Sequence, residues 1–217
     1  MNSQGKQIMK SRFANWPLTS LSGIFVILLY CSFTFASWAF YPDLFGPTTH
    51  YLSRLGNFNY SPFGAYFYNL GCILTGLALF PFFIGLYEWY TDRLYQKMPL
   101  IVGQVIGILS AIALVMIGVF SEDQGSPHMT ASSTFFLLNF FVLIIVNAAL
   151  LLHTRFTKLV ALYAFAIDIL SLSFELTIGG PITEWFTVFG ALLYVAFISF
   201  STIQLRKRPE GTNAKTS

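Results

Sequence analysis

The stretch Leu100–Phe120, LIVGQVIGILSAIALVMIGVF, runs for 21 residues without a charged side chain. A helix needs about 20 mainly apolar residues to cross the hydrocarbon core of a bilayer. Five more stretches have the same character, so the sequence predicts six membrane-spanning helices. We place the six spans at Leu18–Phe40, Phe63–Tyr87, Leu100–Phe120, Ala131–Leu152, Leu159–Leu176 and Trp185–Ile203.

The composition agrees with a chain that is mostly surrounded by lipid. Of 217 residues, 55% are apolar and only 10% are charged, against about 25% charged in soluble domains. The predicted fold class is therefore all-α: a polytopic membrane protein built as a six-transmembrane-helix bundle. Residues 18–204 form the membrane domain, 1–17 a cytoplasmic amino tail and 205–217 a cytoplasmic carboxyl tail that we expect to be disordered.

The positions of the basic residues predict the orientation of the helices. Eleven of the twelve Lys and Arg residues fall in the two tails and in the second and fourth loops. Short cytoplasmic segments carry an excess of Lys and Arg, so both termini are expected inside and the odd-numbered loops outside. The eleven are Lys6, Lys10, Arg12, Arg93, Lys97, Arg155, Lys158, Arg206, Lys207, Arg208 and Lys215.

The first span follows a basic segment, as a signal peptide does, but its apolar run is longer than the roughly 7–15 residues of a cleaved signal. We expect an uncleaved anchor in a plasma (inner) membrane. Cys31 and Cys72 lie inside spans and are expected to be packing residues.

Small and proline residues predict some details of the helices. Pro62, Pro99 and Pro181 lie at or near predicted helix starts, where a missing N–H costs little. Gly103, Gly107 and Ala111 repeat every four residues, a pattern that lets helix backbones approach closely in membranes.

The first outer loop contains polar residues among aromatic ones. A segment around Thr48–Leu55, capped by Thr48 or Thr49 and ended by Gly56, is expected to form a short helix lying on the membrane. This helix would carry Ser53 and Arg54 at the bilayer edge, with His50 close by. For Arg54 the simpler interpretations are a side chain that extends to the membrane interface or a partner for a nearby acid.

The third outer loop has the densest group of titratable residues. Glu122 and Asp123 stand side by side, and His128 follows within seven residues, counting Glu122 as the first. A carboxylate beside a histidine orients the ring and raises its basicity. A solvated loop and a helix-start role for His128 are the structural alternatives.

Several polar residues fall inside the predicted spans, where burial is costly. Asp168 and Glu175 are seven residues apart, which predicts that they share one helix face. Asn69 lies about two turns into the second span. Asn139 and Asn147 are expected to hydrogen-bond between helices, and Glu184 begins the last span on the outer side.

Three short motifs carry a resemblance to a known family: Tyr51-Leu-Ser-Arg-Leu-Gly56, Asn69 followed by Gly71, and Gly118-Val-Phe-Ser-Glu-Asp with His128. Together they resemble the six-helix membrane family filed as domain of unknown function 998. That family is similar at a distance to membrane proteins of the autophagy-modulator and growth-factor-receptor-activating type, some linked to lipid handling. The resemblance implies a six-helix fold and an outer polar cluster. The family often has an acid where this chain has Arg54, so no metal role is implied there.

We expect a non-enzymatic membrane protein with an outward-facing polar cavity that binds a lipid headgroup or a small polar ligand. The chain has no His-Glu-x-x-His, no Gly-x-Ser-x-Gly and no phosphate-cradling glycine loop. We expect no metal, no cofactor and no nucleic-acid partner; membrane lipids are the expected partners. The expected lining is His50, Ser53, Arg54, Asn69, Glu122, Asp123, His128, Asp168 and Glu175.

Two alternatives remain open. The first is a lipid hydrolase or transferase with His128 as the base, and with Glu122 or Asp123 orienting it or binding a metal. The second is a proton-coupled transporter that uses Asp168 and Glu175 as carriers.

Overall fold

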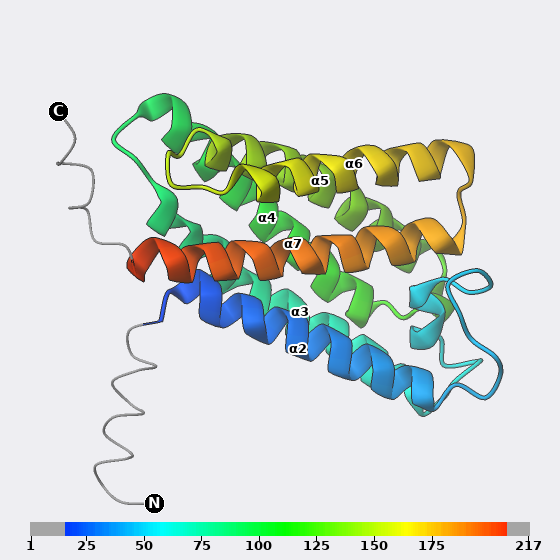
Figure 1. Cartoon of the computed structure of the whole chain (residues 1–217). Coiled ribbons are helices and arrows are strands. Elements are labelled where there is room, and N and C mark those ends of the chain that lie inside the picture. The colour runs from blue at the N-terminus through cyan, green and yellow to red at the C-terminus, as the bar shows by residue number, and fades with distance from the viewer. Residues whose placement is uncertain (1–15, 208–217) are drawn as a thin grey trace, which may run out of the picture.

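The structure, a computed structural model, describes residues 16–207 and contains six long helices in this range (Figure 1). All six are long and apolar enough to cross a membrane. Three short 3-10 helices, η1, η2 and η3, lie between them. The elements are α2 (Leu18–Ala39), η1 (Leu52–Gly56), α3 (Gly64–Gly85), η2 (Leu86–Trp89), α4 (Leu94–Val119), η3 (Glu122–Gln124), α5 (Ser126–Leu151), α6 (Lys158–Thr177) and α7 (Pro181–Lys207).

The helices form a closed ring. Each one packs against the helix before it and the helix after it, and α7 returns to pack against α2. The beginning of α2 and the end of α7 lie at one end of the bundle, which we call the tail end (Figure 1). The first, third and fifth loops lie at the other end, which we call the loop end. The predicted six-helix bundle is confirmed.

Three helices begin four to six residues earlier than the sequence predicts: α4, α5, and α7, which starts at Pro181 instead of Trp185. Helix α4 starts at Leu94 instead of Leu100, so Pro99 lies inside the helix and not at its start. The polar first turn is held by Gln96, whose side chain is buried, accepts from the N–H of Thr91 at 3.1 Å and donates to the carbonyl of Trp89 at 3.0 Å. Helix α5 starts at Ser126 because Gly125 adopts φ = 68°, which a glycine tolerates, and a proline follows in the first turn.

The predicted ladder of small residues is a contact surface of α4. A side chain added at Gly103 would collide with Val146 of α5, and one added at Gly107 would collide with the ring of Phe83 of α3. The ladder therefore brings α4 close to both neighbours in the ring.

The first loop folds over the loop end and does not form the predicted surface helix from Thr48. Its helix, η1, begins only at Leu52 and has no side-chain cap. Leu52 and Leu55 are wholly buried, because one turn of η1 directs both side chains into the bundle. Burial of these two leucines therefore decides where η1 lies.

At the tail end, Glu88 joins the first and last helices. Its carboxylate accepts from Nε of Arg206 at 2.9 Å and from the backbone N–H of Leu18 at 3.3 Å. Helix α7 continues through Lys207, past the predicted start of the carboxyl tail at residue 205. The expected disorder of that tail from residue 208 onward lies outside the described residues, as do Lys6, Lys10, Arg12, Arg208 and Lys215.

Candidate functional site

An apolar cavity lies inside the ring of helices. Its volume is about 90 Å³, and α2, α3, α4, α5 and α7 all contribute to its wall. Most of the lining is aliphatic or aromatic, as in Val26, Leu79, Phe82, Leu114 and Ile198. Small polar side chains interrupt this wall at Thr75, Ser110, Ser132, Asn139 and Thr187. The cavity therefore offers a mainly apolar space within the membrane domain.

A cluster of polar groups stands at the loop end of this cavity. Glu184, from the first turn of α7, and Ser53, from η1, both line it. Tyr30 and Tyr68 also line it, and their two side chains are neighbours. A carboxyl group and three hydroxyl groups thus lie toward one end of a space whose wall is mainly apolar. We call Tyr30, Ser53, Tyr68 and Glu184 the polar cap.

Glu184 has a second contact that explains its position. Its Oε2 accepts a hydrogen bond from the backbone N–H of Leu52 at 2.8 Å. This N–H belongs to the first turn of η1, which has no earlier turn to supply an acceptor. The same side chain therefore lines the cavity and holds the loop that covers it.

Three further hydrogen bonds attach the first loop to the bundle. Nδ2 of Asn69 donates to the carbonyl of Gly56 at 2.9 Å, and Oγ of Ser37 donates to the carbonyl of Leu55 at 3.2 Å. Nε1 of Trp185 donates to the carbonyl of His50 at 2.9 Å. Side chains of α2, α3 and α7 thus donate hydrogen bonds to three backbone carbonyl groups of the first loop.

The third loop binds the outer surface of the first. Glu122 pairs with Nε of Arg54 at 3.4 Å and accepts from the side-chain amide of Asn57. Asp123 accepts from the backbone N–H of Phe58 at 3.3 Å. The guanidinium of Arg54 also lies 4.4 Å from the centre of the Tyr60 ring. These predicted site residues come together, but as a contact between two loops.

His128 is buried at the start of α5, and its Nδ1 lies 2.7 Å from the carbonyl oxygen of Phe120. A carbonyl only accepts, so Nδ1 carries the proton and donates. Among the described residues, no hydrogen bond or ion pair joins His128 to Glu122 or Asp123. The hydrolase hypothesis therefore has no support from an acid that orients this ring.

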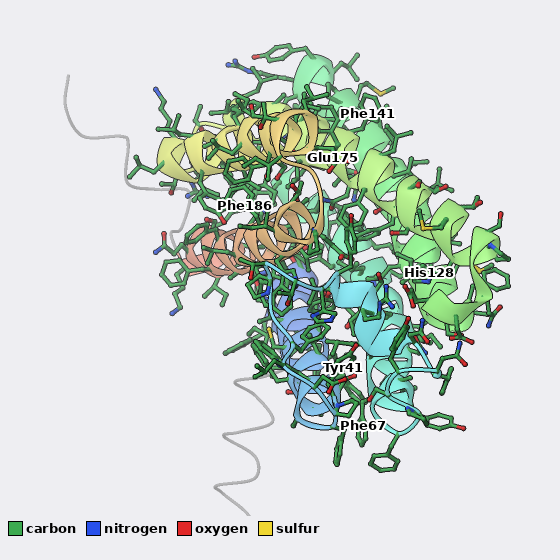
Figure 2. The ribbon with its side chains drawn as sticks, turned by 90° about the vertical axis from the view of Figure 1, so that its right-hand side faces the viewer. Tyr41, Phe67, His128, Phe141, Glu175 and Phe186 are labelled. Atoms are coloured by element: carbon green, nitrogen blue, oxygen red, sulfur yellow. The ribbon has the colours of Figure 1, made fainter. Side chains whose placement is uncertain are left out.

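The two carboxylates of α6 do not share one environment. Asp168 is buried near Tyr194, whereas Glu175 is exposed near the loop end of α6 (Figure 2). The four buried residues of α6 are Ala161, Ala164, Ile167 and Asp168. None of the α6 residues after Asp168 is buried. The seven-residue spacing therefore does not bury both acids inside the bundle.

The predicted residues are therefore distributed over several places. Of them, only Ser53 lines the cavity. His50 stacks on Phe45, with ring centres 5.1 Å apart, and its Nδ1 lies 2.9 Å from Oγ1 of Thr49. Within residues 16–207, no three His, Cys, Asp or Glu side chains are grouped closely enough to hold a metal ion. A binding role for the predicted set stays a prediction.

Sequence reasoning did not find most of the polar cap. Tyr30 and Tyr68 lie inside apolar runs, where a tyrosine is an ordinary packing residue. Glu184 was marked only as an acid at the start of the last span. Asn147 does join helices as predicted, because its Nδ2 donates to the carbonyl of Ala161 at 2.9 Å.

This fold, with six apolar helices and a cavity inside them, defines an integral multi-pass membrane protein. The particular family is shown by the comparison with family models. Residues 24–203 match the family described as "Protein of unknown function (DUF998)", and the chain belongs to that family. No curated protein matches the chain. No solved structure matches it either.

Proposed function

We propose that this protein binds a single-chain amphiphile, with the head at the polar cap and the adjoining part of the hydrocarbon chain inside the ring of helices. The observation that carries the proposal is the lining of one cavity: the wall is mainly apolar, with only small polar side chains in it, and the carboxyl group of Glu184 lies at the loop end with three hydroxyl groups. Ligand sites typically combine an apolar lining with a few polar groups that set orientation. An apolar space of this kind excludes water and favours hydrocarbon.

The polar cap indicates which head the ligand carries. A carboxyl group accepts hydrogen bonds, and phenol and serine hydroxyls both donate and accept. A head with hydroxyl or amine donors therefore fits Glu184, Ser53 and the two tyrosines. A phosphate or carboxylate head would bring a second acidic group beside Glu184, which is unfavourable in a medium of low dielectric constant.

The orientation we propose follows from charge. In the described range, six Lys and Arg residues lie at the tail end and only Arg54 lies at the loop end. The positive-inside rule then places the tail end in the cytoplasm and the polar cap in the outer half of a plasma membrane. The ligand head would accordingly face the outer leaflet.

Filling the cavity tests the proposal. Ala191 lines it and Ala196, on the same helix, does not. Ala191→Phe should remove space for the chain, while Ala196→Phe adds the same side chain elsewhere on α7. We expect native mass spectrometry to show a co-purified amphiphile, or added hexadecanol, on the wild type and on Ala196→Phe, but at least tenfold less on Ala191→Phe.

Equal retention of the amphiphile by Ala191→Phe and Ala196→Phe would overturn the proposal, since the bound molecule would then lie outside the ring. Absence of any bound hexadecanol on the wild type would also overturn it. Thermal unfolding of both variants checks that the helices still assemble. The head preference is tested by comparing hexadecanol with palmitate, and we expect the alcohol to bind more tightly.

A further inference from the structure

A second, polar pocket lies at the tail end, outside the ring cavity. Its volume is about 40 Å³, and four of its five lining residues are polar. The last turns of α7 contribute Ser201, Gln204 and Leu205, and the loop between α5 and α6 contributes Arg155 and Thr157. By the ~10–15 Å³ that one water molecule needs, this space holds roughly three waters or one small oxyanion.

Ser201 is the informative side chain of this pocket. It is only 7% exposed, and no hydrogen bond to its hydroxyl occurs among the described residues. Its neighbours behave differently: Ser199 donates to the carbonyl of Val195 at 2.7 Å, and Thr202 donates to that of Ile198 at 2.8 Å. A serine or threonine hydroxyl in an apolar helix commonly donates to the backbone carbonyl four residues earlier in this way. Ser201 is instead one of the residues that line the pocket.

The groups around the pocket are suited to an anion. A guanidinium recognises oxyanions through paired N–H donors, and hydroxyl and amide groups add donors from the other side. Thr157 immediately precedes α6, a helix of 20 residues, whose first N–H groups and dipole favour negative charge. The pocket thus combines a cation, three neutral polar side chains and a helix start.

The charges of the surrounding surface act in the same direction. At the tail end the described basic residues are Arg93, Lys97, Arg155, Lys158, Arg206 and Lys207. The described acids there are Glu88 and Asp92, and Glu88 is paired with Arg206. An anion in the pocket therefore meets a surface with excess positive charge.

We infer that the pocket formed by Arg155, Thr157, Ser201 and Gln204 binds a phosphate group. The phosphate belongs either to the headgroup of a membrane lipid or to a free phosphate ion, since both present the same tetrahedral oxyanion. Basic pockets on the cytoplasmic side of membrane helices have the geometry for lipid phosphates. This site is separate from the ring cavity, so the two proposals succeed or fail independently.

The test uses the full chain and two probes. Binding of inorganic phosphate to protein in neutral detergent is measured by isothermal titration calorimetry. Retention of dioleoyl phosphatidic acid, against dioleoylglycerol with the same chains, is measured by native mass spectrometry. The variants are Arg155→Gln and Ser201→Ala, and the matched control is Arg93→Gln, which removes an arginine at the same end outside the pocket.

We expect the wild type and Arg93→Gln to bind the phosphate group equally. We expect Arg155→Gln to bind about tenfold less, since a hydrogen bond to a charged group is typically worth that factor or more. Ser201→Ala should also weaken binding, by about threefold or more. Preference for phosphatidic acid over dioleoylglycerol identifies a lipid source, and binding of inorganic phosphate without that preference identifies a free ion.

Three results would overturn the inference. The wild type could bind neither probe. Arg93→Gln could lose as much binding as Arg155→Gln, which would show general surface attraction. Ser201→Ala could bind as the wild type does, which would show that Arg155 acts from the surface without the pocket. Unchanged thermal unfolding of each variant excludes a loss of fold as the cause.

Discussion

Replacing Glu184 with leucine tests whether the first loop is held over the cavity by this side chain. The substitution removes the acceptor of the Leu52 N–H, a hydrogen bond of 2.8 Å. Because Leu52 is wholly buried, water does not replace the lost acceptor. A buried donor left without a partner costs about 1–3 kcal/mol. That range corresponds to roughly a five- to 150-fold increase in the population of the undocked loop.

Amide hydrogen exchange of the protein in nanodiscs measures this population directly. We expect exchange at Leu52 to speed up by about five- to 150-fold in Glu184→Leu. The amide of Gln96, at the tail end, should be unaffected. Glu184→Gln keeps a carbonyl oxygen at this position and should have a smaller effect. Unchanged exchange at Leu52 in Glu184→Leu would refute the reasoning, and equal acceleration at Gln96 would show general loosening instead.

Three more outcomes are expected. Gly85→Ala should lower the free energy of unfolding by about 1–3 kcal/mol, since an added methyl would lie 2.5 Å from the backbone nitrogen of Thr19; unfolding in mixed micelles measures it. Asn147→Ala should lower it by about 0.6–1.7 kcal/mol. Asn139→Ala should lower it less in the same assay, because within residues 16–207 the Asn139 side chain makes no hydrogen bond to another helix. Burial lowers the pKa of His153 below its ordinary value of 6.5. As the pH falls, the unfolded chain therefore binds a proton on this histidine before the folded chain does. The free energy of unfolding should be highest above pH 6.5 and decrease below it, and His153→Gln should remove this pH dependence.

The spans could be read from the sequence because the bilayer imposes a local requirement. Each crossing needs a long apolar run whose backbone hydrogen bonds are satisfied within the helix. Leu100–Phe120 meets that requirement without reference to any other segment. The start of α4 is predicted six residues too late because Arg93 and Lys97 indicate a loop and Pro99 a helix start, which leaves Gln96 outside the predicted span. Its side chain is instead buried against Trp89 and Thr91, which only the folded chain brings together.

The polar cap was harder to predict because its tyrosines lie in apolar stretches of the sequence, where tyrosine is a common packing residue. Tyr30 and Tyr68 are separated by a whole loop in the chain and meet only when α2 packs against α3. Conversely, Glu122 and Arg54 looked like ligand-binding groups because they are charged residues on the outer side. The structure pairs them with each other, and both side chains are partly buried.

Six long apolar helices, and a concentration of basic residues in the terminal segments and the second and fourth loops, could be read directly from the sequence. These properties depend on the length and charge of consecutive residues. Three features became visible only in the folded chain: α7 closes the ring against α2, a mainly apolar cavity lies inside, and Glu184 both lines it and holds the loop above it. The physical reason is that lipid solvates every apolar helix face almost equally well. The choice of neighbours therefore depends on close packing and hydrogen bonds between residues far apart in the chain.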